Sequence, residues 1–331
     1  MKTILRETFL WKIARKTYRK IKFLCLKYSA KYDMADKEHI KHFGKDFPEK
    51  IFYVIRRRPP GAGLLSNFHW VLNNTLYAVS KGYVPVVNMQ DYKTFYNVSY
   101  PIEIEGGGAL NAWEYYFEQP AGYSLKDIKN AKNVILGDWD NYRADEFPNP
   151  WENIHKYNEL VSKYCRFNSK TILASEKKKQ IVFQDKRNIL GVLHRGTDYK
   201  TSKGSNLTAS LEQIIEKVRL VFQEEKFDYI FLMTEEQEAV DEFRKVFAQL
   251  LMVSDSERIT NYNAKDGLLP DIIQKTSSSP YERNLEYLTD TILLSQCDGI
   301  IASKVNGTLL ALGLNNNKYR YSYIFDLGVN L

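Results

Sequence analysis

Residues 51–87 read IFYVIRRRPPGAGLLSNFHWVLNNTLYAVSKGYVPVV, and they change pattern three times. The apolar run 51–55 predicts a buried strand, and 56–63 must form a loop because it is rich in proline and glycine. Apolar residues then recur at helical spacing over 64–81, and 84–87 is a second apolar run. A strand, a helix and a strand in this order predict a parallel sheet with a ligand crevice at the carboxyl ends of its strands.

The rest of the chain repeats this alternation. Further strands are predicted at 133–136, 188–193, 229–233, 299–302 and 321–325, and helices at 150–180 (two), 208–224, 236–251, 283–296 and 307–314. The pattern favours an α/β protein with two Rossmann-like lobes in tandem, each with its own parallel sheet, and a cleft between them. The expected division is a basic helical arm at 1–50, an N-terminal lobe at 51–165 and a C-terminal lobe at 166–331.

Length and composition agree with two globular lobes. The chain has 331 residues, of which 44% are hydrophobic and 26% charged, so it is expected to fold. Its three cysteines are far apart and form no Cys/His cluster, which favours neither a disulfide framework nor a zinc site. A reducing, cytoplasmic location is expected.

The formal charge of +7 is concentrated in the first 50 residues, which hold 14 Lys and Arg against 6 Asp and Glu. The remaining residues hold 33 Lys and Arg against 34 Asp and Glu, so they are nearly neutral. Apolar residues interleaved with lysine and arginine over 1–28 predict a helix that lies on an anionic membrane surface, and packing on the protein itself or on a partner is the competing interpretation. The apolar runs are too short to span a bilayer, and no cleavage site follows them. Nucleic acid is not an expected partner, because no stacking or groove-reading motif accompanies the charge.

Three predicted strands of the second half end in polar residues. Arg195 follows the first, and the planar guanidinium suits a diphosphate because it donates two parallel hydrogen bonds and stays charged. A structural ion pair with Asp198 would explain the same residue. The second strand ends in Thr234, Glu235 and Glu236, which the dipole of the following helix would also favour. The third ends in 303–308, where the first amides of a helix could hold a phosphate or a side chain could cap the helix.

These segments resemble the three motifs of the GDP-fucose-dependent fucosyltransferase superfamily, which includes the α1,6, α1,2 and protein O-fucosyltransferases. Residues Gly191-Val-Leu-His-Arg-Gly-Thr-Asp198 match a family pattern of the type Gly-Val-His-x-Arg-Arg-Thr-Asp. Residues 233–236 are similar to the second motif, usually Ala-Thr-Asp-Asp, and residues 290–307 are similar to the third. The loop Gly61-Ala-Gly-Leu-Leu-Ser-Asn67 is similar to the Gly-Gly-x-x-Asn-Gln loop of those enzymes.

The resemblance implies a GT-B fold and inverting transfer of a sugar, most simply fucose from GDP-fucose, without a metal or another cofactor. It implies that Arg195 neutralises the departing diphosphate and that Asp290 helps to hold guanine. The acceptor would be a glycan or a lipid-linked glycan, as in bacterial surface polysaccharide synthesis at the inner face of the membrane. The candidate catalytic residues are Arg195 and Asp198, and the candidate donor-binding residues are His194, Gly196, Thr197, Lys200, Thr234, Glu235, Glu236, Asp290, Ser303, Asn306, Gly307 and Thr308.

The chain also departs from the family pattern. Leu193 stands where the family often has a histidine, Gly196 replaces a second arginine, and both carboxylates of the second motif are glutamates. Arg195 is retained, and His194, Lys200 or Lys203 could supply a second cation. The phosphate chemistry is therefore better supported than recognition of guanine or fucose.

On the acceptor side the candidates are Gly61, Gly63, Asn67 and Glu114. A base must deprotonate the acceptor hydroxyl, and Asp198, Glu114 and Asp91 are all candidates for it. The aromatic residues 113–117 could stack on sugars or belong to the core.

Two other functions compete with this one. Asp138 and Asp140 have the Asp-x-Asp spacing with which metal-dependent GT-A transferases bind a divalent ion. A protein that binds a nucleotide or a glycan without catalysis would tolerate Leu193 and Gly196.

Overall fold

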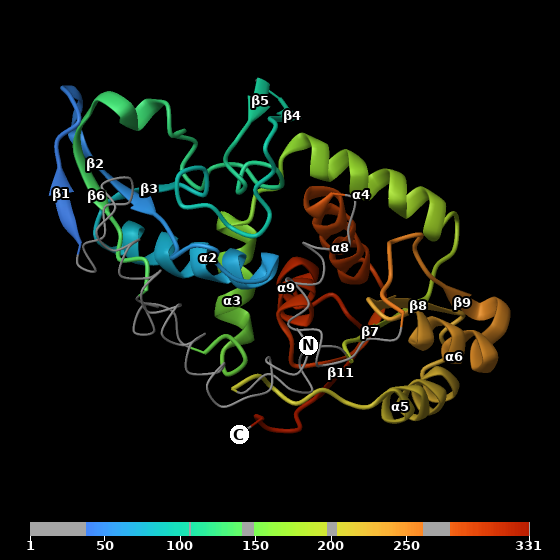
Figure 1. The fold of residues 1–331 in the computed structure, drawn as a ribbon. Coiled ribbons are helices and arrows are strands. Elements are labelled where there is room, and N and C mark those ends of the chain that lie inside the picture. The colour runs from blue at the N-terminus through green and yellow to red at the C-terminus, as the bar shows by residue number, and fades with distance from the viewer. Residues whose placement is uncertain (1–37, 106, 141–148, 197–203, 261–278, 331) are drawn as a thin grey trace, which may run out of the picture.

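The computed structural model describes residues 38–105, 107–140, 149–196, 204–260 and 279–330. Two largely parallel sheets lie at opposite sides of the molecule, and helices α2, α3, α8 and α9 lie between them (Figure 1). The predicted α/β class with two parallel sheets is therefore confirmed. Within the described ranges, every helix is too short or too polar to cross a bilayer.

The N-terminal sheet has the strand order β1-β6-β2-β3. Its strands are β1 (His39–Lys41), β2 (Asp46–Ile55), β3 (Val84–Val87) and β6 (Ala131–Leu136). β2 is parallel to both β3 and β6, whereas β1 runs antiparallel along the edge of β6. Helix α2 (Leu64–Ser80) connects β2 to β3, as the pattern of 51–87 predicts.

The predicted arm at 1–50 is wrong for its described part. Residues 39–41 and 46–50 are strands and not helix, because their backbone groups complete the sheet beside β6. Residues 1–37, with the predicted membrane-binding segment 1–28, lie outside the described residues. A short hairpin of β4 (Ile102–Ile104) and β5 (Gly107–Ala109) and a 3-10 turn at Asp127–Asn130 complete this half.

The C-terminal sheet has five parallel strands in the order β11-β10-β7-β8-β9. They are β7 (Ile189–His194), β8 (Tyr229–Thr234), β9 (Leu251–Met252), β10 (Gly299–Ser303) and β11 (Tyr321–Phe325). The chain builds outward from β7 through β8 to β9, and then returns to the other side of β7 with β10. This reversal between β7 and β10 is the switch point at which open α/β sheets bind ligands.

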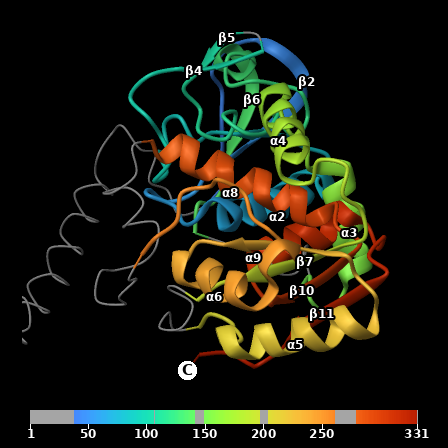
Figure 2. The ribbon, with the colours of Figure 1, turned by 90° about the vertical axis from the view of Figure 1, so that its right-hand side faces the viewer.

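Both faces of this sheet are covered (Figure 2). Helices α5 (Leu211–Glu224) and α6 (Gln237–Phe247) pack on one face, and α6 continues into a short 3-10 turn at Ala248–Leu250. Helices α8 (Pro280–Ser295) and α9 (Asn306–Asn315) cover the other face, with α4 (Ser169–Val182) packed on α8. Alternate residues of the strands therefore face two different cores.

The two lobes share one hydrophobic core. Gly313 of α9 allows the close approach of α3 (Ile154–Tyr164), since a Cβ there would overlap Tyr157 and Val161. The same core includes residues of α2 and α8, and Nε2 of His69 lies 2.7 Å from the Tyr157 hydroxyl. The lobes are thus packed together along α3 and α9. One pocket is lined by β8, α8 and the segment after β9, and another by the start of α2 and residues 89–117, so each of the two lies within one lobe. The predicted cleft between the lobes stays a prediction.

Candidate functional site

Arg195 follows the last residue of β7, at the switch point of the C-terminal sheet. Its side chain is 14% exposed, so it is neither locked in the core nor freely mobile in solvent. Nη1 lies 2.5 Å from Oε2 of Glu235, which follows the neighbouring strand β8. The first two predicted motifs therefore meet in an ion pair.

Tyr287 of α8 holds the same guanidinium from another side. Its hydroxyl lies 3.5 Å from Nη1 of Arg195, and the guanidinium carbon is 5.8 Å from the centre of its ring. The hydroxyl also touches Gly307, where a Cβ would come within 2.7 Å of it. Arg195 therefore lies beside the N-terminal end of α9, where the N-cap residue Val305 provides no side-chain hydrogen bond.

His194 and Glu236 form a second pair at the same sheet edge. Nδ1 of His194 lies 3.3 Å from Oε2 of Glu236, and His194 is almost fully buried. A Cβ at Gly196 would overlap both the Glu236 carboxylate and the His194 ring. A side chain at 196 would therefore require the Glu236 carboxylate or the His194 ring to move, and the imidazole of His194 faces that glutamate.

The N-terminal lobe brings a second arginine to this region. The charges of Arg195, Glu235 and Arg57 all act on the hydroxyl of Tyr96, whose pKa is raised mainly by burial. This hydroxyl bonds the backbone of Leu64, the first residue of α2. Arg195 and Arg57, which come from different lobes, are thus both close enough to Tyr96 to affect the pKa of its hydroxyl.

The three consecutive arginines after β2 have three different environments. Arg56 is buried, donates from Nε to the Gly137 carbonyl over 2.6 Å, and lies against the rings of Tyr92 and Trp139. Arg58 is exposed and pairs with Asp140. Only Arg57 turns toward α2, where Nη1 donates to Oδ1 of Asn67 over 2.8 Å.

The predicted acceptor-side loop belongs to this same arrangement. Asn67 accepts from the backbone of Ala62 and donates back to its carbonyl, which fixes the loop that contains Gly61 and Gly63. Gly61 has a φ of 75°, a left-handed conformation that glycine adopts readily. The loop lies at the start of α2, and so beside Tyr96.

Asp290 lines a narrow pocket together with residues of β8, α8 and the segment after β9. Its Oδ1 accepts from Nζ of Lys178 over 3.0 Å, and its Oδ2 accepts from the hydroxyls of Ser254 and Ser256. Thr234, Glu235 and Tyr287 line the same pocket. The pocket is therefore continuous with the surroundings of Arg195.

The hydroxyl groups of the third motif bond the protein's own backbone. Ser303 Oγ accepts from the backbone of Ala209, and Thr308 Oγ1 donates to the Ser303 carbonyl over 2.7 Å. Both residues are fully buried. Asn306 and Gly307 begin α9, so the contribution of this motif to a ligand would come from the helix start and not from the two hydroxyls.

Glu114 lies in the segment after the β4–β5 hairpin, in contact with a side chain that also bonds Val87 at the end of β3. It accepts from Gln119 over 2.8 Å, and burial raises its pKa above the usual range of a glutamate. Asp91 accepts from Asn88 in an exposed turn nearby. The aromatic residues around Trp113 stack on one another in the core, as in the pair Trp113 and Phe117 with centres 4.4 Å apart.

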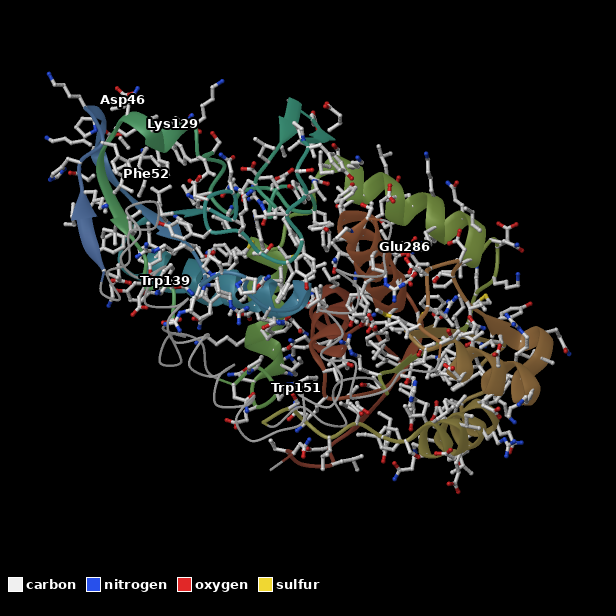
Figure 3. All side chains as sticks on the ribbon, viewed as in Figure 1. Asp46, Phe52, Lys129, Trp139, Trp151 and Glu286 are labelled. Atoms are coloured by element: carbon white, nitrogen blue, oxygen red, sulfur yellow. The ribbon has the colours of Figure 1, made fainter. Side chains whose placement is uncertain are left out.

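Asp138 and Asp140 follow β6 in the N-terminal lobe (Trp139 is labelled in Figure 3). Asp138 accepts from the backbone of Asp140, whose own carboxylate pairs with Arg58. Across the described ranges, no three His, Cys, Asp or Glu residues are grouped as a metal site would require. Thr197, Asp198, Lys200 and Lys203 lie outside the described residues.

Arg57, Tyr96 and Tyr287 are site residues that sequence reasoning missed. The only feature of the sequence that could have indicated Arg57 is its position just before the glycine loop 61–63. Nothing in the sequence distinguishes Tyr96 and Tyr287 from the other tyrosines, of which the chain has 23 in all.

No protein-family model matches the sequence, and a sequence search of curated proteins finds no relative. The structure is similar to that of fucosyltransferase NodZ from Bradyrhizobium, with 16% identity, a TM-score of 0.43, and 79% of this chain and 92% of that chain covered. It is also similar to a mutant of Arabidopsis thaliana FUT1 in complex with GDP, at 12% identity and a TM-score of 0.47 over 93% of this chain and 77% of that one. The apo form of POFUT1 is similar as well, with 10% identity and a TM-score of 0.46, and the match covers 83% of this chain and 97% of that chain.

Proposed function

We propose that this protein is a glycosyltransferase that transfers a sugar from a nucleoside diphosphate, most simply fucose from GDP-fucose, to a glycan acceptor with inversion. The observation that carries the proposal is the position of Arg195. It lies at the switch point of a five-stranded parallel sheet, beside the start of α9, whose N-cap residue is the apolar Val305.

The surroundings of Arg195 suit a diphosphate. Two arginines from different lobes, Arg195 and Arg57, act on the same tyrosine hydroxyl, and the starts of α2 and α9 lie next to them. Helix starts offer free backbone N–H groups and a positive dipole end to an anion. Arginine adds two parallel donors and a permanent charge.

Transfer of a glycosyl group needs this arrangement most when the bond to the diphosphate breaks. Negative charge then develops on the leaving oxygens, and donors fixed in advance stabilise it without having to reorganise. Glu235 and Tyr287 hold Arg195 in one orientation before the donor arrives. We assign them as positioning residues.

Glu235 also competes with the donor for Arg195. A diphosphate can displace the carboxylate, because it carries more charge and accepts two parallel bonds from the guanidinium. The burial of Tyr96 raises the pKa of its hydroxyl, so this group stays neutral and can donate to a phosphate oxygen.

We further propose that the acceptor is part of a surface polysaccharide or a lipid-linked glycan and that the protein works at the cytoplasmic face of the membrane. The basic charge of 1–50 supports this location. The base that activates the acceptor is proposed among Asp198, Glu114 and Asp91. The raised pKa of Glu114 suits a proton acceptor, whereas Asp198 is nearest to Arg195 in sequence.

The decisive experiment is transfer by Arg195→Ala and Arg195→Lys measured with GDP-fucose. We expect loss of about a hundredfold or more in kcat for the alanine variant with little change in Tm, since an oxyanion-stabilising donor contributes that much. Unchanged turnover would refute the proposal. EDTA separates the metal-dependent mechanism, in which turnover would fall and Mn²⁺ would restore it.

A further inference from the structure

Residues 40–46 and 126–132 form one corner of the N-terminal lobe. The two segments lie next to each other, because Asp46 is paired with Ala131 in the sheet. Figure 1 shows β1 and the neighbouring part of β2 at the outer end of this lobe, opposite the C-terminal sheet. Asp46 and Lys129 are labelled there in Figure 3. The corner is thus separate from the candidate site at the C-terminal sheet.

The corner carries an excess of positive charge, and we refer to it as the basic corner. One of its two aspartates is already engaged within the protein, because Asp127 accepts from the backbone and the hydroxyl of Ser124, and these bonds lower its pKa. Four of its five lysines are exposed, and Lys41 is half-buried. The charged residues of the basic corner are Lys41, Lys45, Lys126, Lys129, Lys132, Asp46 and Asp127.

Two large apolar side chains are exposed within the basic corner. Ile40 is 57% exposed and Phe43 is 44% exposed. β1 is the edge strand of its sheet, and lysines on an edge strand can serve to prevent pairing with another chain. That role explains the charge but not the exposed apolar residues, which would favour such pairing. Charge and apolar surface together indicate a partner that offers a match for both.

The backbone around Phe43 is fixed. The N–H groups of Phe43 and Gly44 donate to the carbonyl of Ala131 over 3.1 and 3.2 Å. Nδ1 of His42 lies 2.5 Å from the carbonyl of Lys132. The exposed ring is therefore presented by a defined backbone and not by a loose loop, so little backbone order is lost when it enters a partner surface.

An anionic lipid surface matches both features. Its headgroup boundary takes up exposed apolar side chains, and its phosphates attract lysine, whose apolar stem can lie along the boundary. A protein partner or a second copy fits less well, because protein interfaces are depleted in lysine. Nucleic acid would match the charge, but its contacts are mainly polar and offer little to the aliphatic side chain of Ile40.

The sequence that leads into the basic corner has the same sign of charge. Residues 1–37 hold 11 Lys and Arg against 3 Asp and Glu. The chain enters the described part at Glu38, whose carboxylate accepts from the hydroxyls of Tyr53 and Tyr77. These two bonds tie the end of the basic sequence to the sheet directly before β1. A membrane that attracts residues 1–37 would therefore meet the basic corner as well.

We propose that the basic corner docks on an anionic lipid membrane, with Ile40 and Phe43 in the headgroup boundary and the lysines at the lipid phosphates. This inference rests on the proposed membrane location and is independent of the proposed sugar transfer. It assigns the location to folded residues in addition to the segment 1–28.

The first test is flotation of the full chain with vesicles. One set contains phosphatidylcholine alone, and the other contains phosphatidylcholine and phosphatidylglycerol in equal amounts. We expect binding to the anionic vesicles only, and weaker binding at about 1 M salt, where the screening length falls to about 3 Å. Equal binding to both sets, or to neither, would overturn the inference. Binding to a DNA oligonucleotide but to no vesicle would overturn it too, and would assign the surface to nucleic acid.

The second test separates the basic corner from residues 1–37, which every variant retains. Lys129→Gln combined with Lys132→Gln should bind anionic vesicles about 25-fold more weakly, because each lysine near such a surface contributes about fivefold. Lys177→Gln combined with Lys179→Gln, on the exposed face of α4, is the matched control and should bind as the wild type. Unchanged binding by the first pair, or an equal loss in both pairs, would show that the basic corner is not the docking surface.

The third test concerns the apolar contact. Phe43→Ser should bind anionic vesicles about tenfold more weakly, since its ring no longer enters the headgroup boundary. Leu220→Ser on α5, where the leucine is 49% exposed, is the control and should have no effect. Equal results for the two variants would remove Phe43 from the docking surface.

The failure of this inference is distinguishable from that of the proposed function. The substituted side chains lie outside the candidate site, so every variant should bind GDP as the wild type does. If the wild type binds anionic vesicles and the variants bind equally well, the basic corner is excluded while the membrane location stays. If the wild type binds no anionic vesicle, the location fails with it. Sugar transfer is tested separately by Arg195→Ala.

Discussion

Nη1 of Arg195 lies 2.5 Å from Oε2 of Glu235, so the arginine that would meet the diphosphate already has an anionic partner. The two residues come from the ends of neighbouring parallel strands, and both are largely shielded from solvent. The ion pair keeps the guanidinium at the sheet edge. A diphosphate that binds Arg195 would have to displace the carboxylate of Glu235.

Replacement of Glu235 by Gln should therefore strengthen nucleotide binding. The amide keeps the size of the side chain but removes a charge that repels the diphosphate and competes for Arg195. We expect GDP to bind about threefold to tenfold more tightly by titration calorimetry, with a lower kcat because Arg195 is less well oriented. Weaker binding of GDP would show instead that Glu235 is needed to hold the arginine in place.

Arg57 and Arg58 provide a matched pair of adjacent arginines. Arg57 turns toward Asn67 and the start of α2, whereas Arg58 is exposed and pairs with Asp140. Arg57→Gln should weaken GDP binding about tenfold, as expected for the loss of one charge-assisted contact. Arg58→Gln should leave it unchanged. Equal effects of the two substitutions would remove Arg57 from the site.

A methyl group at Gly196 should destabilise the fold. A Cβ there would overlap the carboxylate of Glu236 and the ring of His194, and overpacking of this kind costs about 1–3 kcal/mol. Gly196→Ala should lower the free energy of unfolding by that amount in a urea titration. Gly63→Ala is the control, since its Cβ would make only an ordinary contact of 3.8 Å with Tyr96.

The reason for the loss at Gly196 can be tested separately. If the overlap with Glu236 causes it, Glu236→Ala should recover part of the stability of Gly196→Ala, and the two substitutions should not be additive. Strict additivity would place the cause elsewhere.

His69 should make the protein sensitive to mild acid. Burial lowers its pKa from 6.5 to about 4, while the unfolded chain keeps the higher value. The neutral ring therefore contributes stability that is fully present above pH 6.5 and is lost as the pH falls from 6.5 toward 4. The loss amounts to about 3 kcal/mol.

Chemical denaturation of the wild type and of His69→Gln at several pH values measures this contribution. The variant keeps a polar group for the Tyr157 hydroxyl but cannot titrate, so its stability should fall less between pH 6.5 and 4. His155→Gln, an exposed position on α3, should retain the wild-type profile. Parallel profiles for the wild type and His69→Gln would contradict the assignment.

Much of the fold follows from local sequence pattern. β3 and β11 lie where the apolar runs place them, and α2 agrees with its prediction to one residue, because buried parallel strands and amphipathic helices have distinct periods. β9 was missed because Leu251 and Met252 continue the apolar pattern of α6. β1 was missed because a charged edge strand looks like part of the basic arm.

The candidate site is less visible in sequence. Polar residues at strand ends indicate that Arg195 and Glu235 share one sheet edge, since neighbouring strands are parallel. Sequence alone does not tell which of three adjacent arginines turns inward, because Arg56 to Arg58 differ only in what surrounds them after folding. The dependence of Gly196 on Glu236 involves two residues forty positions apart, and it too needs the folded structure.

The packing of α3 on α9 through Gly313 bears on how the molecule can be divided. A cut near residue 165 would put α3 and α9 on different fragments. Tyr157 and Val161 of the first fragment would then be exposed, and α9 of the second fragment would lose its contacts with them. We expect neither fragment to be soluble by itself, and calorimetry of the intact chain to give a single melting transition. Modules of this protein would then not be interchangeable by recombination at that point, and grafting of its C-terminal sheet into another enzyme would have to carry α3 along.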